Sequence, residues 1–413
     1  MTARSPVVFL HIGAMKTGTT YLQQVLIQNK DALAEHGYLF PGTTWTAQVR
    51  AAHDAVGHHR ERQVKAGAAG AWQALTEEML GHEGAASIFS VEFLGFAGRA
   101  AAERIVLDLA PAEVHVVLTV RDTCAVLPTL WQTHCANGGT ASWASFARSA
   151  RLGASAGWAA PLLGQGARLF RRALDVPRML DVWGALVPPE RLHVVTVPPP
   201  GAPRDLLWRR FADVIGLDPE VATNPAQGHN PSLGYPSADL MRRLNAELGR
   251  LPRGEYNPTL KHHLAEKVLA RRAALESRAG LDARAYEFGV RWNRRTRAAV
   301  EESGAHLVGD LDDLPATVAR TDLPKRIEPP DRGDLLAAAA TALQGMGRLA
   351  GRRARRLRAL GGEAASQGRP EKAAVARAAW AEAPDPLRAA VEDVADVCRV
   401  AIAEHERILR LRG

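Results

Sequence analysis

The chain has 413 residues, and its 46% hydrophobic content is enough to bury a sizeable core in two compact units, or in one unit with an extension. Its net charge of +8 favours anionic partners, but the sequence has no zinc finger or RNA-binding signature, so no nucleic-acid partner is expected. No stretch approaches the roughly 18 apolar residues of a membrane span, and the start does not have the pattern of a signal peptide, so a cytoplasmic location is predicted.

The first predicted element is a buried strand that leads into a glycine-bearing turn. Residues 7–10 form a short, partly β-branched apolar run, as in a buried parallel strand. The turn follows, and a helical pattern begins directly after it. The first amides of a helix have no intrahelical partner and lie at the positive end of its dipole, so they attract anions. The predicted anion site consists of Gly13, Lys16, Thr17, Gly18, Thr19 and Thr20.

The order of residues in this turn distinguishes it from a Walker A loop. That loop has its lysine directly after the second glycine, whereas here Gly18 is followed by Thr19 and the lysine lies two residues before Gly18. The run HIGAMKTGTTYLQ instead resembles the 5′-phosphosulfate loop of bacterial sulfotransferases. The resemblance covers about residues 6–320 and implies an α/β fold, a parallel β-sheet flanked by helices, of the P-loop-NTPase-like sulfotransferase type. It also implies that 3′-phosphoadenosine 5′-phosphosulfate (PAPS) is the donor and that the bisphosphate PAP is the product.

A second buried strand, predicted over residues 86–91, places Glu92 at its C-terminal end. Ligands of open α/β sheets bind outside the carboxyl ends of the strands, so a carboxylate there is suitably placed for chemistry. Sulfuryl transfer to a hydroxyl needs a general base, and glycan-modifying members of the family are taken to use a glutamate at this place. Glu92 resembles that glutamate by position only, because Phe93 and Leu94 depart from the family's usual Lys-Ser/Thr-Pro. The alternative is a salt-bridged carboxylate, or one that caps the helix starting near Gly98.

A third strand, predicted over residues 112–122, carries a second family signature. The segment VLTVRDTCAVLPTLWQ resembles the 3′-phosphate motif, a strand ending in arginine with a serine eight residues later on the next helix. Arg121 matches the arginine, whose planar fork suits bidentate phosphate binding, and Thr129 stands at the serine position. Pro128 requires that this helix begin nearby or be kinked.

Histidines offer a second choice of base, because some family members use one. His11 lies at the mouth of the first strand, beside the anion site, and is either the alternative base or a cofactor contact. His115 lies inside the third strand and is predicted to be structural. The chain's three cysteines have no metal-ligand spacing, so no metal site is predicted.

The middle of the chain predicts the remaining core elements. Residues 143–170 are rich in glycine, serine and alanine and are expected to shape the acceptor pocket. A fourth strand is predicted over residues 191–197, a helix over residues 205–215 and a last strand over residues 305–311. Asn230 or Ser232, in an Asn-x-Ser-Leu element similar to one in the bacterial members, is predicted to cap a helix beginning near Ala238, and a contact with the cofactor is the alternative.

The composition changes after the paired prolines at 329–330. Residues 333–361 and 384–412 are rich in alanine, leucine and arginine at helical spacing, so residues 331–413 are predicted to be a helical extension of an α/β domain formed by residues 1–330. The extension would pack on this core or on a second subunit, as in a homo-oligomer. Its first helix carries a basic stripe, which favours a solvated face, with peripheral contact to an anionic membrane as the alternative. The stripe consists of Arg348, Arg352, Arg353, Arg355, Arg356 and Arg358.

The resemblance implies a PAPS-dependent sulfotransferase acting on a hydroxyl of a carbohydrate, a glycolipid or another small molecule. Lys16 would stabilise the charge that develops as the sulfuryl group leaves, and Glu92 or His11 would deprotonate the acceptor. A nucleotide-dependent kinase of similar fold is one alternative, although the lysine is displaced and no Walker B aspartate is evident. A protein that binds PAPS or PAP without catalysis is the other.

Overall fold

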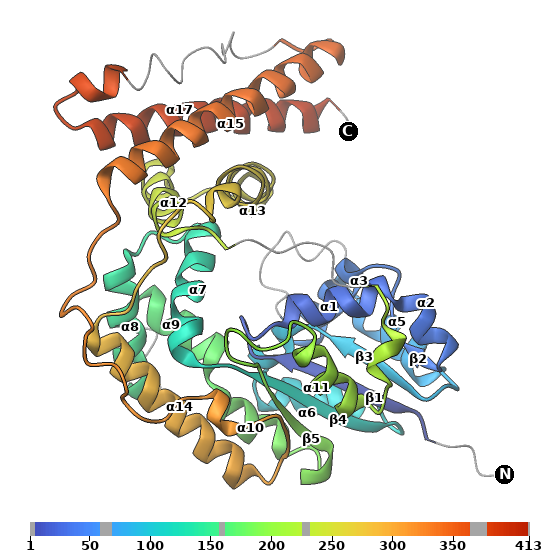
Figure 1. Cartoon of the computed structure of the whole chain (residues 1–413). Coiled ribbons are helices and arrows are strands. Elements are labelled where there is room, and N and C mark those ends of the chain that lie inside the picture. The colour runs from blue at the N-terminus through green and yellow to red at the C-terminus, as the bar shows by residue number, and fades with distance from the viewer. Residues whose placement is uncertain (1–4, 58–67, 157–161, 225–231, 364–377, 412–413) are drawn as a thin grey trace.

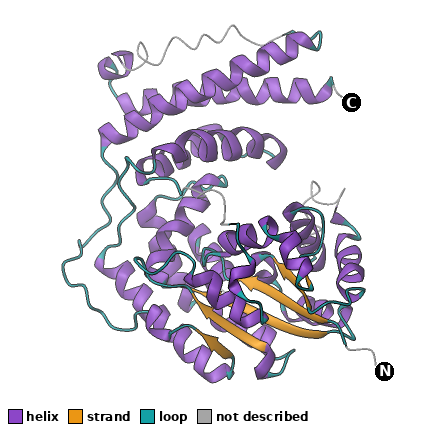
Figure 2. Ribbon diagram, turned by 45° about the vertical axis from the view of Figure 1, so that its right-hand side comes forward, coloured by secondary structure: helices purple, strands orange, loops and turns teal. Residues whose placement is uncertain are grey.

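A parallel sheet forms the centre of one part of the molecule, and a layer of helices lies beyond it (Figures 1 and 2). The computed structural model describes residues 5–57, 68–156, 162–224, 232–363 and 378–411. Within these residues the sheet has six strands in the order β2-β3-β1-β4-β5-β6, each parallel to its neighbours. The predicted α/β class with a helix-flanked parallel sheet is therefore confirmed. The strands are β1 (Val7–Gly13), β2 (Tyr38–Leu39), β3 (Ala86–Ser90), β4 (Glu113–Val120), β5 (Leu192–Thr196) and β6 (His306–Val308).

Helices cover both faces of the sheet because the strands are apolar on both sides. Phe9 of β1 packs in one core with Leu22 of α1 and Phe211 of α11. Leu10, its neighbour in the strand, lies on the other face, in the core that contains Trp183 of α10. The α-helices around the sheet are α1 (Thr19–Gln28), α2 (Lys30–Glu35), α3 (Trp45–Ala55), α5 (Ala71–Leu80), α6 (Arg99–Asp108), α7 (Thr123–Ala136), α8 (Trp143–Ser155), α9 (Gln165–Leu174), α10 (Val176–Gly184), α11 (Leu206–Ile215) and α14 (Ala283–Ser303).

The strand order places β1 at a reversal point of the sheet. The chain runs from β1 to β2 and β3 on one side, and then crosses to β4 on the other side. Open α/β sheets bind their ligands at such a point, outside the carboxyl ends of the strands. The turns after β1, β3 and β4 meet there.

The helical layer lies beyond α7 and α8 (Figure 1). Its members are α12 (Tyr235–Leu248), α13 (Arg253–Tyr256), the π-helix η5 (Asn257–Val268), the 3₁₀ turn η6 (Leu269–Arg272), α15 (Arg332–Ala359) and α17 (Pro386–Arg410). Short 3₁₀ turns, η1 (Glu92–Phe96), η3 (Pro189–Arg191), η4 (Pro219–Val221) and η7 (Leu311–Asp313), connect elements of the sheet region. The predicted C-terminal extension thus packs on helices of its own chain, through contacts such as Gly345 of α15 against Val268 of η5. None of the described helices combines the length and the apolar character needed to cross a bilayer.

The structure bears on two local predictions. Of the two alternatives for Pro128, a helix that begins beside it is excluded, because α7 begins at Thr123 with Asp122 as its N-cap and Pro128 lies inside it. α12 begins at Tyr235 with Gly234 as N-cap and without a side-chain cap, so Ser232 does not have the predicted capping role. Asn230 lies outside the described residues.

Candidate functional site

The turn between β1 and α1 is fixed to the sheet at its beginning. The amide of Ala14 donates to the carbonyl of Thr119 in β4 at 2.9 Å, and the amide of Met15 donates to the carbonyl of Ala173 in α9 at 3.3 Å. Gly13 and Gly18 have φ values of 107° and 86°, a region that glycine occupies without strain. A Cβ on Gly18 would lie 2.3 Å from Leu207 Cδ2, so α11 packs directly on the turn.

Beyond these anchors the backbone presents a row of free amides. Among the described residues, the amides of residues 16–20 have no hydrogen-bond acceptor, and Gly18, the N-cap of α1, supplies no side-chain cap. Successive amides at a helix N-terminus, with the helix dipole behind them, form a binding site for phosphate or sulfate groups. The predicted anion site therefore has the backbone geometry that it needs.

Two cationic side chains border these amides. Lys16 is half-buried, and burial lowers the pKa of its ammonium group; the charge of Glu92 opposes this change, and the charge of Lys261 adds to it. Arg121 follows β4 and donates from Nη1 to the carbonyl of Lys16 at 3.4 Å. Burial likewise lowers the pKa of Arg121, and Asp122 opposes that change. Both cations are thus held in a partly desolvated place where a bound anion would stabilise their charge.

Arg121 is positioned by the start of α7. Asp122 Oδ1 accepts from the amide of Cys124 at 2.9 Å and from Nδ2 of Asn293 at 2.7 Å. Asn293 is buried in α14, and its Oδ1 accepts from the amide of Thr123 at 2.8 Å. The end of β4 is therefore held by a polar contact from a distant helix, which the sequence did not indicate.

Glu92 lies directly against the turn. A Cβ on Gly13 would be 3.1 Å from Cβ of Glu92, and Gln23 of α1 donates from Nε2 to Oε2 of Glu92 at 3.0 Å. The 3₁₀ turn η1 that Glu92 begins is held by Arg178, which donates to the carbonyls of Gly95 and Ala97. The structure thus brings Glu92 together with Lys16, as predicted from its strand end. The capping alternative is not observed in the described chain, where Gly98 is the N-cap of α6 and makes no side-chain cap bond.

His11 is not placed to act as a base or to contact a cofactor. It is 0% exposed, and its ring nitrogens contact hydroxyls of two neighbouring strands, Nδ1 with Ser90 Oγ at 2.8 Å and Nε2 with Thr119 Oγ1 at 3.3 Å. Burial lowers its pKa to about 3, so the ring is neutral at physiological pH. This geometry argues against both predicted roles of His11, as a base and as a cofactor contact, because both of its ring nitrogens contact buried hydroxyls of the neighbouring strands.

The threonines of the turn have different roles. The hydroxyl of Thr17 is buried, where it donates to the carbonyl of Ala14 at 2.6 Å and lies 2.5 Å from Thr119 Oγ1. Of the groups of Thr17, only the backbone amide is therefore free to make the predicted contact with the cofactor. Thr19 is buried at the first position of α1, and Thr20 is exposed at the second.

Thr119 is a buried residue of the site that no sequence motif singled out. Besides its contacts with His11 and Thr17, its Oγ1 donates to the carbonyl of Gly13 at 3.1 Å. One buried hydroxyl thus links β4 to both ends of the turn. The only sequence signal was its place two residues before Arg121, within the same motif.

Thr129 does not offer its hydroxyl hydrogen to a ligand in this structure. It lies within α7, and its Oγ1 donates to the carbonyl of Val126 at 2.7 Å. Bonding back to the same helix is common for threonine. A contact with the 3′-phosphate would require that this hydroxyl rotate away from Val126.

Lys261 approaches the site from the helical layer. Thr259 and Val268 of η5 face α15, where Arg353 donates to Thr259 Oγ1 at 2.8 Å. Lys261 is two residues beyond Thr259, roughly half a helical turn, so it lies on the side away from α15. Its charge acts on Lys16, as noted above, and nothing in the sequence pattern predicted this proximity.

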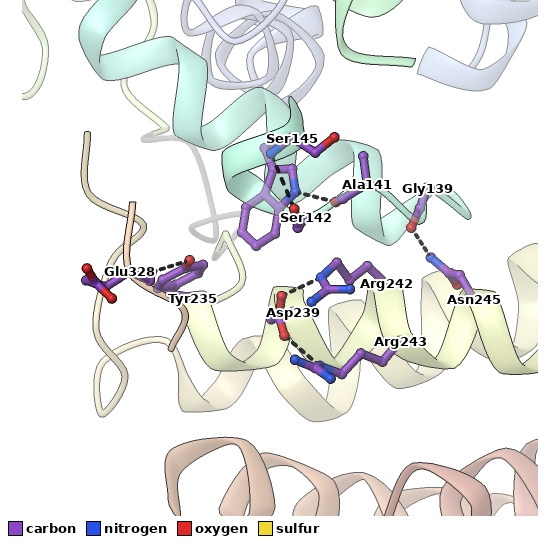
Figure 3. A network of polar contacts seen from close by, with 11 residues as sticks. Gly139, Ala141, Ser142, Ser145, Tyr235, Asp239, Arg242, Arg243, Asn245 and Glu328 are labelled. Carbon is purple, nitrogen blue, oxygen red and sulfur yellow. Dashed lines mark hydrogen bonds and ion pairs between the residues drawn. The ribbon is translucent and has the colours of Figure 1, made fainter. Parts of the chain in front are cut away.

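The helical layer is held in place by α7, the same helix that begins beside Arg121. Asn245 of α12 donates from Nδ2 to the carbonyls of Cys135 and Gly139, each at 2.8 Å. Figure 3 shows the bond to Gly139. The hydroxyl of Tyr256, which directly precedes η5, donates to Oδ1 of Asn245 at 2.9 Å. The hydrogen bonds of Asn245 and Tyr256 therefore fix the position of η5, the helix that contains Lys261.

The region expected to shape an acceptor pocket is used largely for packing. Trp143 and Phe146 of α8 and Phe170 of α9 are buried in the core. Cavities of about 290 Å³, near Leu281 and Arg320, and of about 410 Å³, near Trp72 and Arg104, lie away from the turn. Residues 157–161, within the expected acceptor region, lie outside the described residues.

Comparison with known proteins gives no relative: no protein-family model, no curated protein and no solved structure matches the chain significantly. Function is therefore inferred from the residues of the site.

Proposed function

We propose that the protein is a sulfotransferase that uses PAPS as donor and an acceptor hydroxyl of a carbohydrate, a glycolipid or another small molecule. One observation carries the proposal: the row of free amides at residues 16–20 begins at Lys16, Arg121 contacts the Lys16 carbonyl, and the carboxylate-bearing residue Glu92 packs against Gly13 of the same turn. Amides and two cations suit a ligand with two anionic groups, and the resemblance of the turn to the 5′-phosphosulfate loop supports PAPS as that ligand.

The residues of the turn would hold the 5′-phosphosulfate, through the amides of residues 16–20, the Lys16 ammonium group and the hydroxyls of Thr19 and Thr20. Arg121 would bind the 3′-phosphate, and nucleotides without that phosphate would leave its guanidinium without a partner. Gly13 and Gly18 contribute by their backbone conformation and by the absence of a side chain. The donor, when bound, supplies an activated sulfuryl group that an acceptor oxygen can attack.

Glu92 would take the proton of the acceptor hydroxyl. Its Oε2 is fixed by Gln23, so Oε1 is the oxygen available for the proton. As the acceptor oxygen bonds to sulfur and the bridging S–O bond breaks, the bond electrons pass to the departing phosphate oxygen, where Lys16 stabilises the charge. His11 takes no part, since its ring is buried.

The test is calorimetric binding of adenosine 3′,5′-bisphosphate without magnesium. Lys16→Ala and Arg121→Ala should each weaken binding by roughly 10- to 150-fold, because each removes a charge-assisted contact worth about 1.5–3 kcal/mol. Lys267→Ala and Arg148→Ala, exposed positions elsewhere, are the controls and should bind like the wild type. Equal affinity for AMP and for the bisphosphate would contradict the assignment of the 3′-phosphate to Arg121.

The position of Glu92 also supports the alternative function, a nucleotide-dependent kinase. It follows β3, the strand next to β1, and a carboxylate there could hold magnesium beside the bound phosphates. Magnesium-dependent binding of ATP, without binding of the bisphosphate, would favour the kinase. Glu92→Gln distinguishes catalysis from binding alone: a sulfotransferase should lose turnover and keep bisphosphate affinity, whereas a protein that only binds would show no turnover in either form.

A further inference from the structure

The two long helices of the C-terminal region run parallel, so their C-terminal ends lie together. At one end of the pair, Arg332 of α15 forms an ion pair with Asp385, the N-cap of α17, with Nη2 and Oδ1 3.3 Å apart. At the other end, a Cβ on Gly362 would lie 2.9 Å from Leu411 Cδ1, and Arg407 donates to the carbonyl of Glu363 at 3.3 Å. We call residues 352–363 and 405–411 the C-terminal tip (Figure 1).

The C-terminal tip exposes a group of leucines. Leu360 is 40% exposed, Leu409 53% and Leu411 51%, whereas Leu357 and Ile408 beneath them are buried. Single exposed leucines are ordinary on protein surfaces. Three exposed leucines at the joined ends of two helices bring more apolar surface to the C-terminal tip than a single leucine does.

Exposed arginines surround these leucines. Within the described residues, none of them forms an ion pair of 4 Å or less with a carboxylate; Glu363 and Glu406 are the acidic neighbours at this surface, and the buried carboxylate of Glu404 acts on Arg358 and Arg407 from beneath it. Arg353 does not belong to this group, because its guanidinium turns inward to Thr259 Oγ1 and to the carbonyl of Ala401. The exposed arginines are Arg352, Arg355, Arg356, Arg358, Arg407 and Arg410.

We propose that the C-terminal tip docks on an anionic lipid surface, with the leucines among the acyl chains and the arginines at the headgroups. This arrangement satisfies both kinds of side chain, since arginine stems can lie along apolar surface while their charges stay with the phosphates. Nucleic acid would neutralise the arginines but leave the leucines in water. A second copy of the tip would cover the leucines but bring like charges together. Docking leaves the chain on one side of the bilayer, and it does not depend on the proposed sulfotransferase activity.

The experiment is cosedimentation of the full chain with vesicles of phosphatidylcholine alone or mixed with phosphatidylglycerol. The wild type should bind the anionic vesicles and release from them as salt rises. Arg355→Ala with Arg358→Ala should weaken binding by about 25-fold, roughly fivefold for each arginine near the surface. Leu409→Ser with Leu411→Ser should weaken it by at least about tenfold, because less apolar area enters the bilayer.

Matched controls keep the test decisive. Leu107→Ser, at a leucine that is 68% exposed on α6, and Arg148→Ala with Arg250→Ala should bind vesicles like the wild type. The proposal is overturned if the wild type does not bind anionic vesicles, if the leucine variant binds as well as the wild type, or if the controls lose as much. It is also overturned if the leucine substitutions instead dissociate a dimer seen by sedimentation velocity.

Discussion

The buried hydroxyl of Thr119 should be required both for the stability of the fold and for the shape of the anion site. In Thr119→Val the side chain keeps its size, but its contacts with Gly13 O, His11 Nε2 and Thr17 Oγ1 are lost. Thr17 still donates to the carbonyl of Ala14 and so keeps a partner. The Gly13 carbonyl and the His11 ring lose theirs in a buried place, where each unpaired group costs about 1–3 kcal/mol. Because the histidine contact is long, we expect a loss of about 2–4 kcal/mol in the free energy of unfolding.

The assay is urea unfolding of the valine variant beside Thr119→Ser. Serine keeps the hydroxyl and removes one methyl group, so it should cost only about 1 kcal/mol. Calorimetry with adenosine 3′,5′-bisphosphate should also show about tenfold weaker binding for valine than for serine, the equivalent of about 1.4 kcal/mol, because the turn loses its side-chain link to β4. If valine and serine unfold at the same urea concentration, the hydroxyl does not hold the turn and the reasoning is refuted.

Three further predictions concern the site and the sheet. Lys261→Ala should raise the pKa of Lys16 and weaken binding of the bisphosphate or of an anionic acceptor, whereas Lys267→Ala should change neither; titration of Lys16 by NMR and calorimetry check this. Gly18→Ala should destabilise the fold by roughly 1–2 kcal/mol and weaken anion binding, because alanine is strained at φ 86° and its Cβ would displace Leu207; thermal unfolding measures the cost. Burial, together with the neighbouring histidines His115 and His306, lowers the pKa of His193 in β5 to about 4, below its unfolded value of 6.5. The neutral ring therefore stabilises the fold above pH 6.5, and this stability is lost as the pH falls towards 4. Its contribution should fall by roughly 2 kcal/mol between pH 7.5 and 5, and His193→Gln should remove that part of the decrease in urea unfolding.

Local sequence was enough to predict the main strands and the glycine turn between β1 and α1. The apolar run at β1, the glycines that flank Lys16 and the helix after them are neighbours in the chain, so their conformation follows from short-range rules. The ends of β3 and β4 were predictable in the same way. Parallel strands present their carboxyl ends at one edge, and this placed Glu92 and Arg121 beside the turn.

Tertiary packing alone decided which of these side chains can meet a ligand. His11 and Thr17 are buried because Ser90 and Thr119 approach them from strands that are 79 and 102 residues away in the chain. Lys261 reaches the site only because α12 and η5 are fixed to α7 by contacts such as that of Asn245 with Cys135. The parallel course of α15 and α17, which gathers the leucines and arginines of the C-terminal tip, is likewise absent from the helical periodicity of either segment. Periodicity reports which face of an element is apolar, but the partner of that face is selected by the packing of the whole chain.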